Sequence, residues 1–186
     1  MHLLGRLRRF IAVQLPAYEA RSLHDISEGI AVKRHALRIV VRPARREDAA
    51  SIAALARELA ASVQDPPPRL TARSVAAALF SPSAWSECFV ASKHGNVIGY
   101  ILASRYFEAH TATRQLRIAD LFVNASVRRA GIGRRLYAAL SKRARTLHCQ
   151  EIAWEVWSRN HSAFQFFAGL GAERNDDVAL MRIRVR

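Results

Sequence analysis

Cysteine is nearly absent from this sequence. Only Cys88 and Cys149 occur among the 186 residues, and neither stands in a CxxC or a Cys/His metal-ligand spacing. Two cysteines are too few for a disulfide framework, and no pair of histidines is spaced like metal ligands. We therefore expect two ordinary thiols and no bound metal.

Long apolar stretches are also missing. Apolar residues make up 51% of the chain, which suffices for a packed core, but no uncharged run approaches the roughly 18 residues that span a bilayer. The Arg-bearing first residues also fit a transit peptide or a membrane-surface helix. Because the run FIAVQL is too short for the h-region of a secretory signal, we favour an untargeted extension and a cytoplasmic location without membrane attachment.

Acidic residues are scarce, and their scarcity is uneven. The chain has 15 Asp and Glu against 29 Lys and Arg, a formal net charge of +14, and no acid lies between Asp120 and Glu151. That window holds Arg128, Arg129, Arg134, Arg135, Lys142, Arg143 and Arg145. Such an excess favours an anionic partner, which nucleic acid, an acidic membrane face or a phosphorylated small molecule would all satisfy.

Hydrophobic patterning divides the chain into an N-terminal extension, residues 1–37, and one folded domain, residues 38–186. Helical spacing of apolar residues predicts helices over 45–63, 71–80, 131–147 and 160–171. Alternation and β-branched runs predict strands over 37–41, 87–92, 97–104, 112–123, 151–157 and 178–185. This order indicates an α/β domain on a mixed sheet. Its parallel pair, 112–123 and 151–157, would leave a ligand crevice at the strand ends.

A glycine turn follows the strand that ends in DLFV. Gly131 and Gly133 stand between two pairs of arginines and open the next helix. Unpaired N–H groups at a helix N-terminus, without a Cβ in the way, form a phosphate cradle. The spacing is neither GxGxxG nor GxxxxGK[ST]. The alternative is a glycine-rich turn followed by a solvated basic helix.

Two motifs together resemble the GNAT superfamily of N-acyltransferases. The pattern Arg128-x-x-Gly131-x-Gly133 is similar to its acyl-CoA loop, [Q/R]-x-x-G-x-[G/A]. The segment NHSAFQFFAGLGA is similar to its second motif, at Asn160, Ala163, Phe166, Phe167 and Gly171. From about residue 38 onward the resemblance implies a mixed, mostly antiparallel central sheet with a splayed parallel strand pair, flanked by helices.

The resemblance also implies acetyl-CoA as the co-substrate. The main chain of Leu121, Phe122 and Val123 would pair with the pantetheine arm, and Asn160 would bind the arm from the neighbouring strand. The pyrophosphate would lie in the turn formed by Arg128, Arg129, Ala130, Gly131, Ile132, Gly133 and Arg134.

Two positions depart from the family pattern. Phe167, in the cofactor-binding set, replaces a Tyr that can protonate the departing thiolate, and phenylalanine has no proton to give. Tyr100, Tyr106 or a water would have to substitute. DLFV, the glycine turn and GLGA resemble the spermidine/spermine-type branch, but Ala119 replaces a Glu of that branch.

Asp120 and Glu155 are the candidate catalytic bases, because each lies within an apolar run that faces the expected crevice. Glu155 could instead form an ion pair on an exposed strand face, and Asp120 could instead shape the acceptor pocket. With either base, the expected reaction is direct transfer of the acetyl group to a primary amine of a small molecule or peptide.

The rival from another class is a catalytically weak acyl-CoA-binding or nucleic-acid-binding protein on the same fold. Phe167 and the net charge favour it. RNA-binding modules show stacking aromatics on a basic sheet, however, and the sequence shows no such signature. Nucleic acid is therefore the less favoured partner, and the sequence leaves a homodimer and the acetylation of a protein terminus or lysine open.

Overall fold

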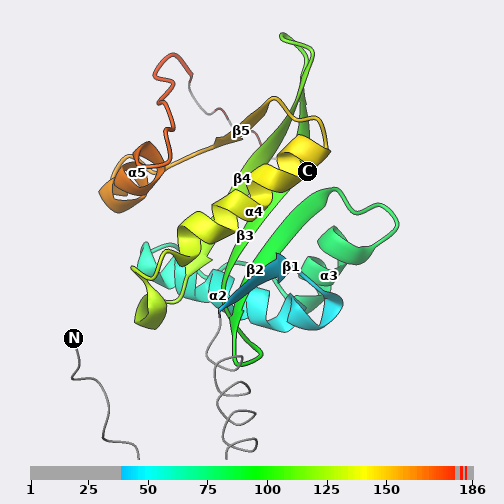
Figure 1. Cartoon of the computed structure of the whole chain (residues 1–186), viewed down its shortest axis with the longest axis vertical. Coiled ribbons are helices and arrows are strands. Elements are labelled where there is room, and N and C mark those ends of the chain that lie inside the picture. The colour runs from blue at the N-terminus through cyan, green and yellow to red at the C-terminus, as the bar shows by residue number, and fades with distance from the viewer. Residues whose placement is uncertain (1–38, 179–180, 182, 184–186) are drawn as a thin grey trace, which may run out of the picture. The chain divides into compact units, whose positions relative to one another are not determined.

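The computed structural model describes residues 39–178, 181 and 183, and its centre is a five-stranded sheet (Figure 1). The strands are β1 (Val40–Pro43), β2 (Ser86–Lys93), β3 (Asn96–Glu108), β4 (Thr113–Val123) and β5 (Glu151–Trp154). They lie in sequence order, with antiparallel pairing throughout except for the parallel pair β4 and β5. The predicted mixed, mostly antiparallel sheet with one parallel pair is confirmed.

Helices cover both faces of this sheet. The α-helices are α2 (Ala49–Ser62), α3 (Ala72–Phe80), α4 (Ile132–Thr146) and α5 (His161–Ala168), and short 3-10 turns span η1 (Arg46–Asp48) and η2 (Ala125–Val127). Helices α2 and α3 contribute to one buried cluster and α4 to another, so the sheet separates two cores. We call its two sides the α2 face and the α4 face.

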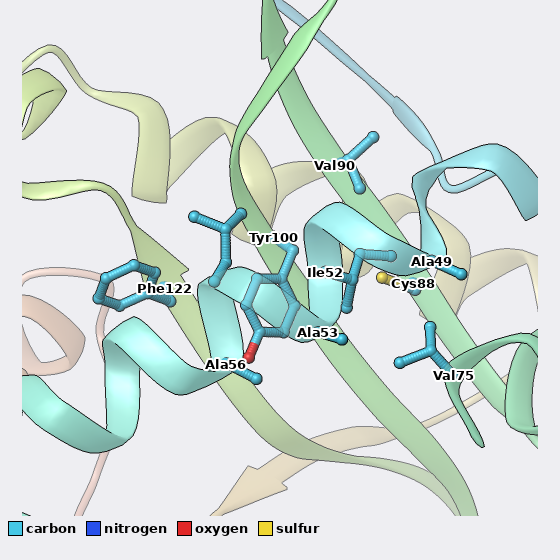
Figure 2. Packing of buried hydrophobic residues seen from close by; sticks show 10 residues of the cluster. Ala49, Ile52, Ala53, Ala56, Val75, Cys88, Val90, Tyr100 and Phe122 are labelled. Carbon is cyan, nitrogen blue, oxygen red and sulfur yellow. The ribbon is translucent and has the colours of Figure 1, made fainter. Parts of the chain in front are cut away.

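The core on the α2 face depends on small side chains. Helix α2 buries Ile52, Ala53 and Ala56, and these alanines let the helix lie close to the sheet (Figure 2). Tyr100 of β3 points its ring toward α2 in the space that the alanines leave (Figure 2). Its side chain is fully buried.

The core on the α4 face follows the helical repeat. Ile132, Leu136, Leu140 and Ala144 recur every four residues and are buried. Residues with this spacing form one stripe along a helix. The arginines of α4 therefore occupy mainly its other sides.

A β-bulge interrupts β4 immediately before Asp120. Leu102 of β3 pairs with Asp120 and the next residue, Ala103, pairs with Ile118, so Ala119 has no partner on β3. An extra residue in one strand reverses which side chains face which side of the sheet.

The packing of β4 residues in the two cores shows this reversal. Before the bulge, Leu116 and Ile118 pack on the α4 face. After it, Phe122 packs on the α2 face, although in a regular strand all three residues would share one side. The bulge thereby carries Asp120 to the α2 face.

Three sequence-based expectations meet the structure differently. The strand expected over 151–157 ends at Trp154, so Glu155 and Trp157 lie beyond it. The strand expected over 178–185 lies mostly outside the described residues, and its described members, Val178, Met181 and Ile183, are in no strand. The extension 1–37 also lies outside the described residues, so the domain division stays a prediction.

A buried ion pair joins β1 to the start of α2. Arg42 donates from Nη1 and Nη2 to Oδ2 and Oδ1 of Asp48 at 2.6 and 2.9 Å. The Arg45 main-chain N–H donates to the same carboxylate at 2.7 Å. The hydrogen bond from Arg42 holds the pKa of Asp48 below its usual value, although burial opposes this.

Removing this carboxylate should destabilise the domain. We expect Asp48→Ala to lower the free energy of unfolding by roughly 1.5 to 3 kcal/mol at neutral pH, because the Arg42 guanidinium loses a charged partner. The folded state lowers the pKa of Asp48. The contribution of this carboxylate to stability is therefore complete above its unfolded pKa of about 4 and is lost as the pH falls from that value through the folded-state pKa. Urea unfolding across pH should show the difference between parent and variant shrinking in acid; a difference independent of pH would contradict this account.

Candidate active site

Among the residues that the structure describes, no strand lies beside one edge of β4 at its C-terminal end. The parallel ladder with β5 stops at Ile118 paired with Trp154. On the opposite edge, the Asn124 N–H donates to the Ile98 carbonyl of β3 at 2.9 Å. Because main-chain groups alternate between the two edges, Leu121 and Val123 direct theirs to the unpaired edge. Phe122, the middle residue, directs its main chain to β3 and its ring into the core on the α2 face.

The glycine turn has the backbone geometry of an anion site. Arg129 and Gly131 have φ angles of 64° and 70°, and Gly131 is the N-cap of α4. A Cβ built on Gly131 would meet no atom within 4 Å, so this side of the turn is open. Left-handed residues beside a helix N-terminus direct main-chain N–H groups into one concavity. The predicted start of the helix near Gly131 is confirmed.

The arginines around the turn have different roles. Arg134 donates to the Gly169 carbonyl at 2.9 Å, and Arg135 donates to the Ile39 carbonyl at 2.6 Å. Arg128 donates from Nε to the Val123 carbonyl at 3.0 Å, on the unpaired edge of β4. These three guanidinium groups hold the turn in place, whereas no hydrogen bond of the Arg129 side chain is seen within the described residues.

A cavity of about 390 Å³ opens beside the unpaired edge. Its lining includes five of the candidate catalytic and cofactor-binding residues that the sequence predicted: Asp120, Leu121, Glu155, Asn160 and Phe167. The other singled-out residues, Phe122, Val123 and 128–134, do not line it. The cavity and the glycine turn are therefore two parts of the candidate site, and the end of β4 connects them.

Asp120 is the carboxylate most removed from water in this cavity. The Tyr100 hydroxyl donates to its Oδ2 at 2.9 Å. Burial raises the pKa of Asp120, and this hydrogen bond partly opposes the rise by favouring the charged form. A carboxylate whose pKa is raised toward neutrality is a better general base than an ordinary one.

Glu155 lies at the cavity but not in the setting that the sequence suggested. It follows the last residue of β5 and is exposed. Trp154 packs against Phe167 with ring centroids 4.4 Å apart, while Trp157 is 44% exposed, and both line the cavity.

Asn160 and Phe167 come to the cavity on α5. Asn160 caps this helix by accepting the Ala163 N–H on Oδ1 at 3.1 Å. Its Nδ2 makes no hydrogen bond within the described residues. Phe167 is buried and has no proton to donate. Of the substitutes expected for the proton donor, neither tyrosine, Tyr100 nor Tyr106, lines the cavity, which leaves a water.

Sequence reasoning missed the wall opposite β4. Leu59, Asp65, Pro66 and Pro68 line the cavity from the end of α2 and the loop after it. The acid before a run of prolines was the available signal. With Asp65, three carboxylates line the cavity, and no Lys or Arg is among its described lining residues.

A family model described as "Acetyltransferase (GNAT) family" matches residues 52–172, and the chain belongs to this family. Acetyl-CoA is the family's co-substrate. The open glycine turn and the unpaired edge of β4 fit it: amides 131–134 would hold the pyrophosphate, and Leu121 and Val123 the arm. When bound, it supplies the acetyl thioester.

Solved structures share the fold. A possible acetyltransferase from Clostridium difficile 630 is 18% identical, with a TM-score of 0.70 over 80% of this chain and 99% of that one. AAC(6')-Iy in complex with the bisubstrate analogue CoA-S-monomethyl-acetylneamine is 20% identical, with a TM-score of 0.67 over 80% and 99%. An aminoglycoside acetyltransferase from an uncultured soil metagenomic sample, in complex with sisomicin, is 15% identical, with a TM-score of 0.67 over 80% and 97%.

These structures give no support to the spermidine/spermine-type branch that the sequence suggested. No curated protein matches the sequence significantly. Among the described residues, no helix is both long and apolar enough to cross a membrane. Nor do the described residues bring together three metal-ligating side chains.

A side chain at Gly131 should block the turn. We expect Gly131→Val to abolish acetyl-CoA binding in isothermal titration, because the Cβ branch fills the open side of the turn and opposes the positive φ. Gly95→Val is the matched control: its φ is +82°, nothing lies within 4 Å of its Cβ, and it sits in the turn between β2 and β3. Both variants carry similar backbone strain, so equal loss of binding in both would refute the assignment of the turn.

Proposed function

We propose that this protein is an N-acetyltransferase that transfers the acetyl group of acetyl-CoA directly to a primary amine. One observation carries the proposal. The unpaired edge of β4, where a pantetheine arm can pair, borders a cavity that holds carboxylates and no described cation. A protein that only bound acyl-CoA would need the glycine turn and the edge of β4, but not the cavity beside them.

The charge of the cavity supports a cationic acceptor. The chain as a whole carries +14, yet Asp65, Asp120 and Glu155 give this cavity the opposite sign. A local negative potential attracts an ammonium group that the rest of the surface repels. Trp154 and Trp157 add aromatic walls to the same cavity, and the Arg159 guanidinium, 4.6 Å from the Trp157 ring centroid, shows a cation held against one of them.

Asp120 serves as the base in this proposal. An amine attacks only as the free base, and an alkylammonium with a pKa near 10.4 must lose a proton first. Asp120 accepts that proton, directly or through a water. Glu155, at the exposed rim, attracts the ammonium.

Main-chain groups stabilise the developing charge. The amine nitrogen bonds to the acetyl carbon, and negative charge grows on the carbonyl oxygen before the carbon–sulfur bond breaks. A main-chain N–H on the unpaired edge, from Leu121 or Val123, donates to that oxygen. Phe167 cannot protonate the departing thiolate, so a water supplies that proton.

A free-thiol assay tests the function directly. Acetyl-CoA and the protein should release thiol with aminoglycosides, polyamines or short peptides that have free N-termini, and the rate should depend on which amine is present. Acetyl-CoA binding without thiol release across this panel would instead identify the rival, an acyl-CoA-binding protein without turnover.

The pH profile should distinguish the two candidate bases. The Tyr100 hydrogen bond favours the Asp120 carboxylate, so Tyr100→Phe should raise the pKa of Asp120 further. We expect the acidic limb of kcat/KM to move to higher pH in this variant. A limb that stays in place would show that Asp120 is not the base.

Substitution of each carboxylate tests the same assignment of roles independently. Asp120→Asn should lower kcat by roughly 10²- to 10⁴-fold, the usual contribution of a general base, with unchanged affinity for acetyl-CoA. Glu155→Gln should mainly raise KM for the acceptor. If Glu155→Gln abolished the acidic limb instead, the two roles would be reversed.

Restoring a proton donor should accelerate the reaction. We expect Phe167→Tyr to raise kcat, by up to roughly 10²-fold, because a phenol near the thiolate replaces water as the acid. Phe167→Leu, which brings no hydroxyl, is the control. Comparable turnover in the tyrosine variant and the parent would mean that protonation of the thiolate does not limit the rate.

A further inference from the structure

The sheet register gathers two aromatic and two basic residues on the α4 face, at the end of the sheet where the β3–β4 hairpin extends (Figure 1). Phe107 lies directly opposite Arg114 on β4. The Arg105 N–H donates to the Trp85 carbonyl at 3.1 Å, which continues the β2–β3 ladder by one pair. Directly opposite residues share a face, and so do residues two apart. Trp85, Arg105, Phe107 and Arg114 therefore form one surface, the hairpin surface.

Its aromatic rings are open to solvent. Trp85 is 66% exposed and Phe107 is 60% exposed. On the opposite face of the same hairpin, Tyr106 is less exposed, at 43%, and the Arg117 guanidinium lies 4.3 Å from its ring centroid. Two large aromatic side chains that are left exposed on one face of a sheet mark a contact site more often than single exposed residues do.

The net charge around these rings is positive. The acid on this surface, Glu87, is neutralised by Arg105 at 2.6 Å and by Arg143 of α4 at 2.9 Å. These two guanidinium groups hold the pKa of Glu87 below its usual value against the opposing effect of burial. Glu87 therefore stays ionised but offsets only one of two arginines.

The segment after α4 packs against the hairpin beside Arg114. The Gln150 N–H donates to the Arg114 carbonyl at 2.9 Å, and the Arg114 N–H donates to the Gln150 side chain at 3.0 Å. This contact holds the segment after α4 against the hairpin.

We propose that the hairpin surface binds single-stranded nucleic acid. Two solvent-open rings offer stacking faces for unpaired bases, and Arg114, which lies directly opposite Phe107, offers a contact for a phosphate. The +14 charge of the chain favours a polyanion over an ordinary protein partner. This surface is separate from the acetyl-transfer site and does not depend on the proposed function.

Fluorescence anisotropy with the full chain tests the proposal. The probes are a labelled uridine oligonucleotide, its deoxythymidine counterpart, a blunt duplex of equal length and a polyglutamate peptide. We expect both single strands to bind more tightly than the duplex, since stacking needs unpaired bases. Trp85→Ala and Phe107→Ala should each weaken single-strand binding roughly tenfold. Arg114→Gln should reduce the slope of log K against log salt by about 0.7.

Matched controls separate this surface from general charge attraction. Tyr106→Ala removes an aromatic from the other face of the hairpin, and Arg73→Gln removes an exposed arginine from α3. Both should bind single strands with an affinity within about twofold of that of the parent. The controls and the two aromatic variants should share one melting temperature, which shows that they are equally folded. Equal affinity for duplex and single strand, parent-like binding by Trp85→Ala and Phe107→Ala, or equal losses in the controls would each overturn the proposal. Polyglutamate binding that the aromatic variants weaken equally would point to an acidic protein instead.

Discussion

The architecture of the candidate site depends on one extra residue in β4. Because Ala119 has no partner on β3, the side-chain alternation of β4 reverses within the strand. The same residue marks where pairing with β5 has ended, so the strand loses a neighbour on one edge just where Asp120 turns to the α2 face. A regular strand would have directed Asp120 toward α4, away from Tyr100. The unpaired edge, the carboxylate and the cavity thus follow from a single irregularity.

Positively and negatively charged side chains lie on different sides of β4. The glycine turn and α4 carry the arginines, and three of the four guanidinium groups at the turn bind main-chain carbonyls, which stabilises the turn. The cavity on the other side of β4 carries Asp65, Asp120 and Glu155. In the proposed reaction, an anionic co-substrate and a cationic acceptor would therefore approach from different directions and meet at the unpaired edge. The overall charge of +14 conceals this division.

The sequence was most informative where function depends on backbone conformation. The arrangement Arg128-x-x-Gly131-x-Gly133 after a strand predicted both the helix start and the open turn, because few residues besides glycine adopt a positive φ without strain. Other features could not be predicted from the pattern. The run EIAWEVW reads as one strand, yet β5 stops at Trp154, since its partner strand bulges away there. Asp65 looked like an ordinary loop residue because the cavity wall opposite β4 is built from residues far apart in the chain.

The amino-acid sequence by itself determined the order of the elements from β1 to α5, the mixed sheet, the glycine turn, a side chain without a transferable proton at Phe167 and the excess of positive charge. These properties reside in local spacing and in side-chain chemistry. Only the tertiary structure decided that Asp120 lies against Tyr100, that three carboxylates share one cavity, and that Trp85 and Phe107 lie among arginines on one face. Those facts depend on strand register and on a bulge, which arise from pairing between segments distant in the chain.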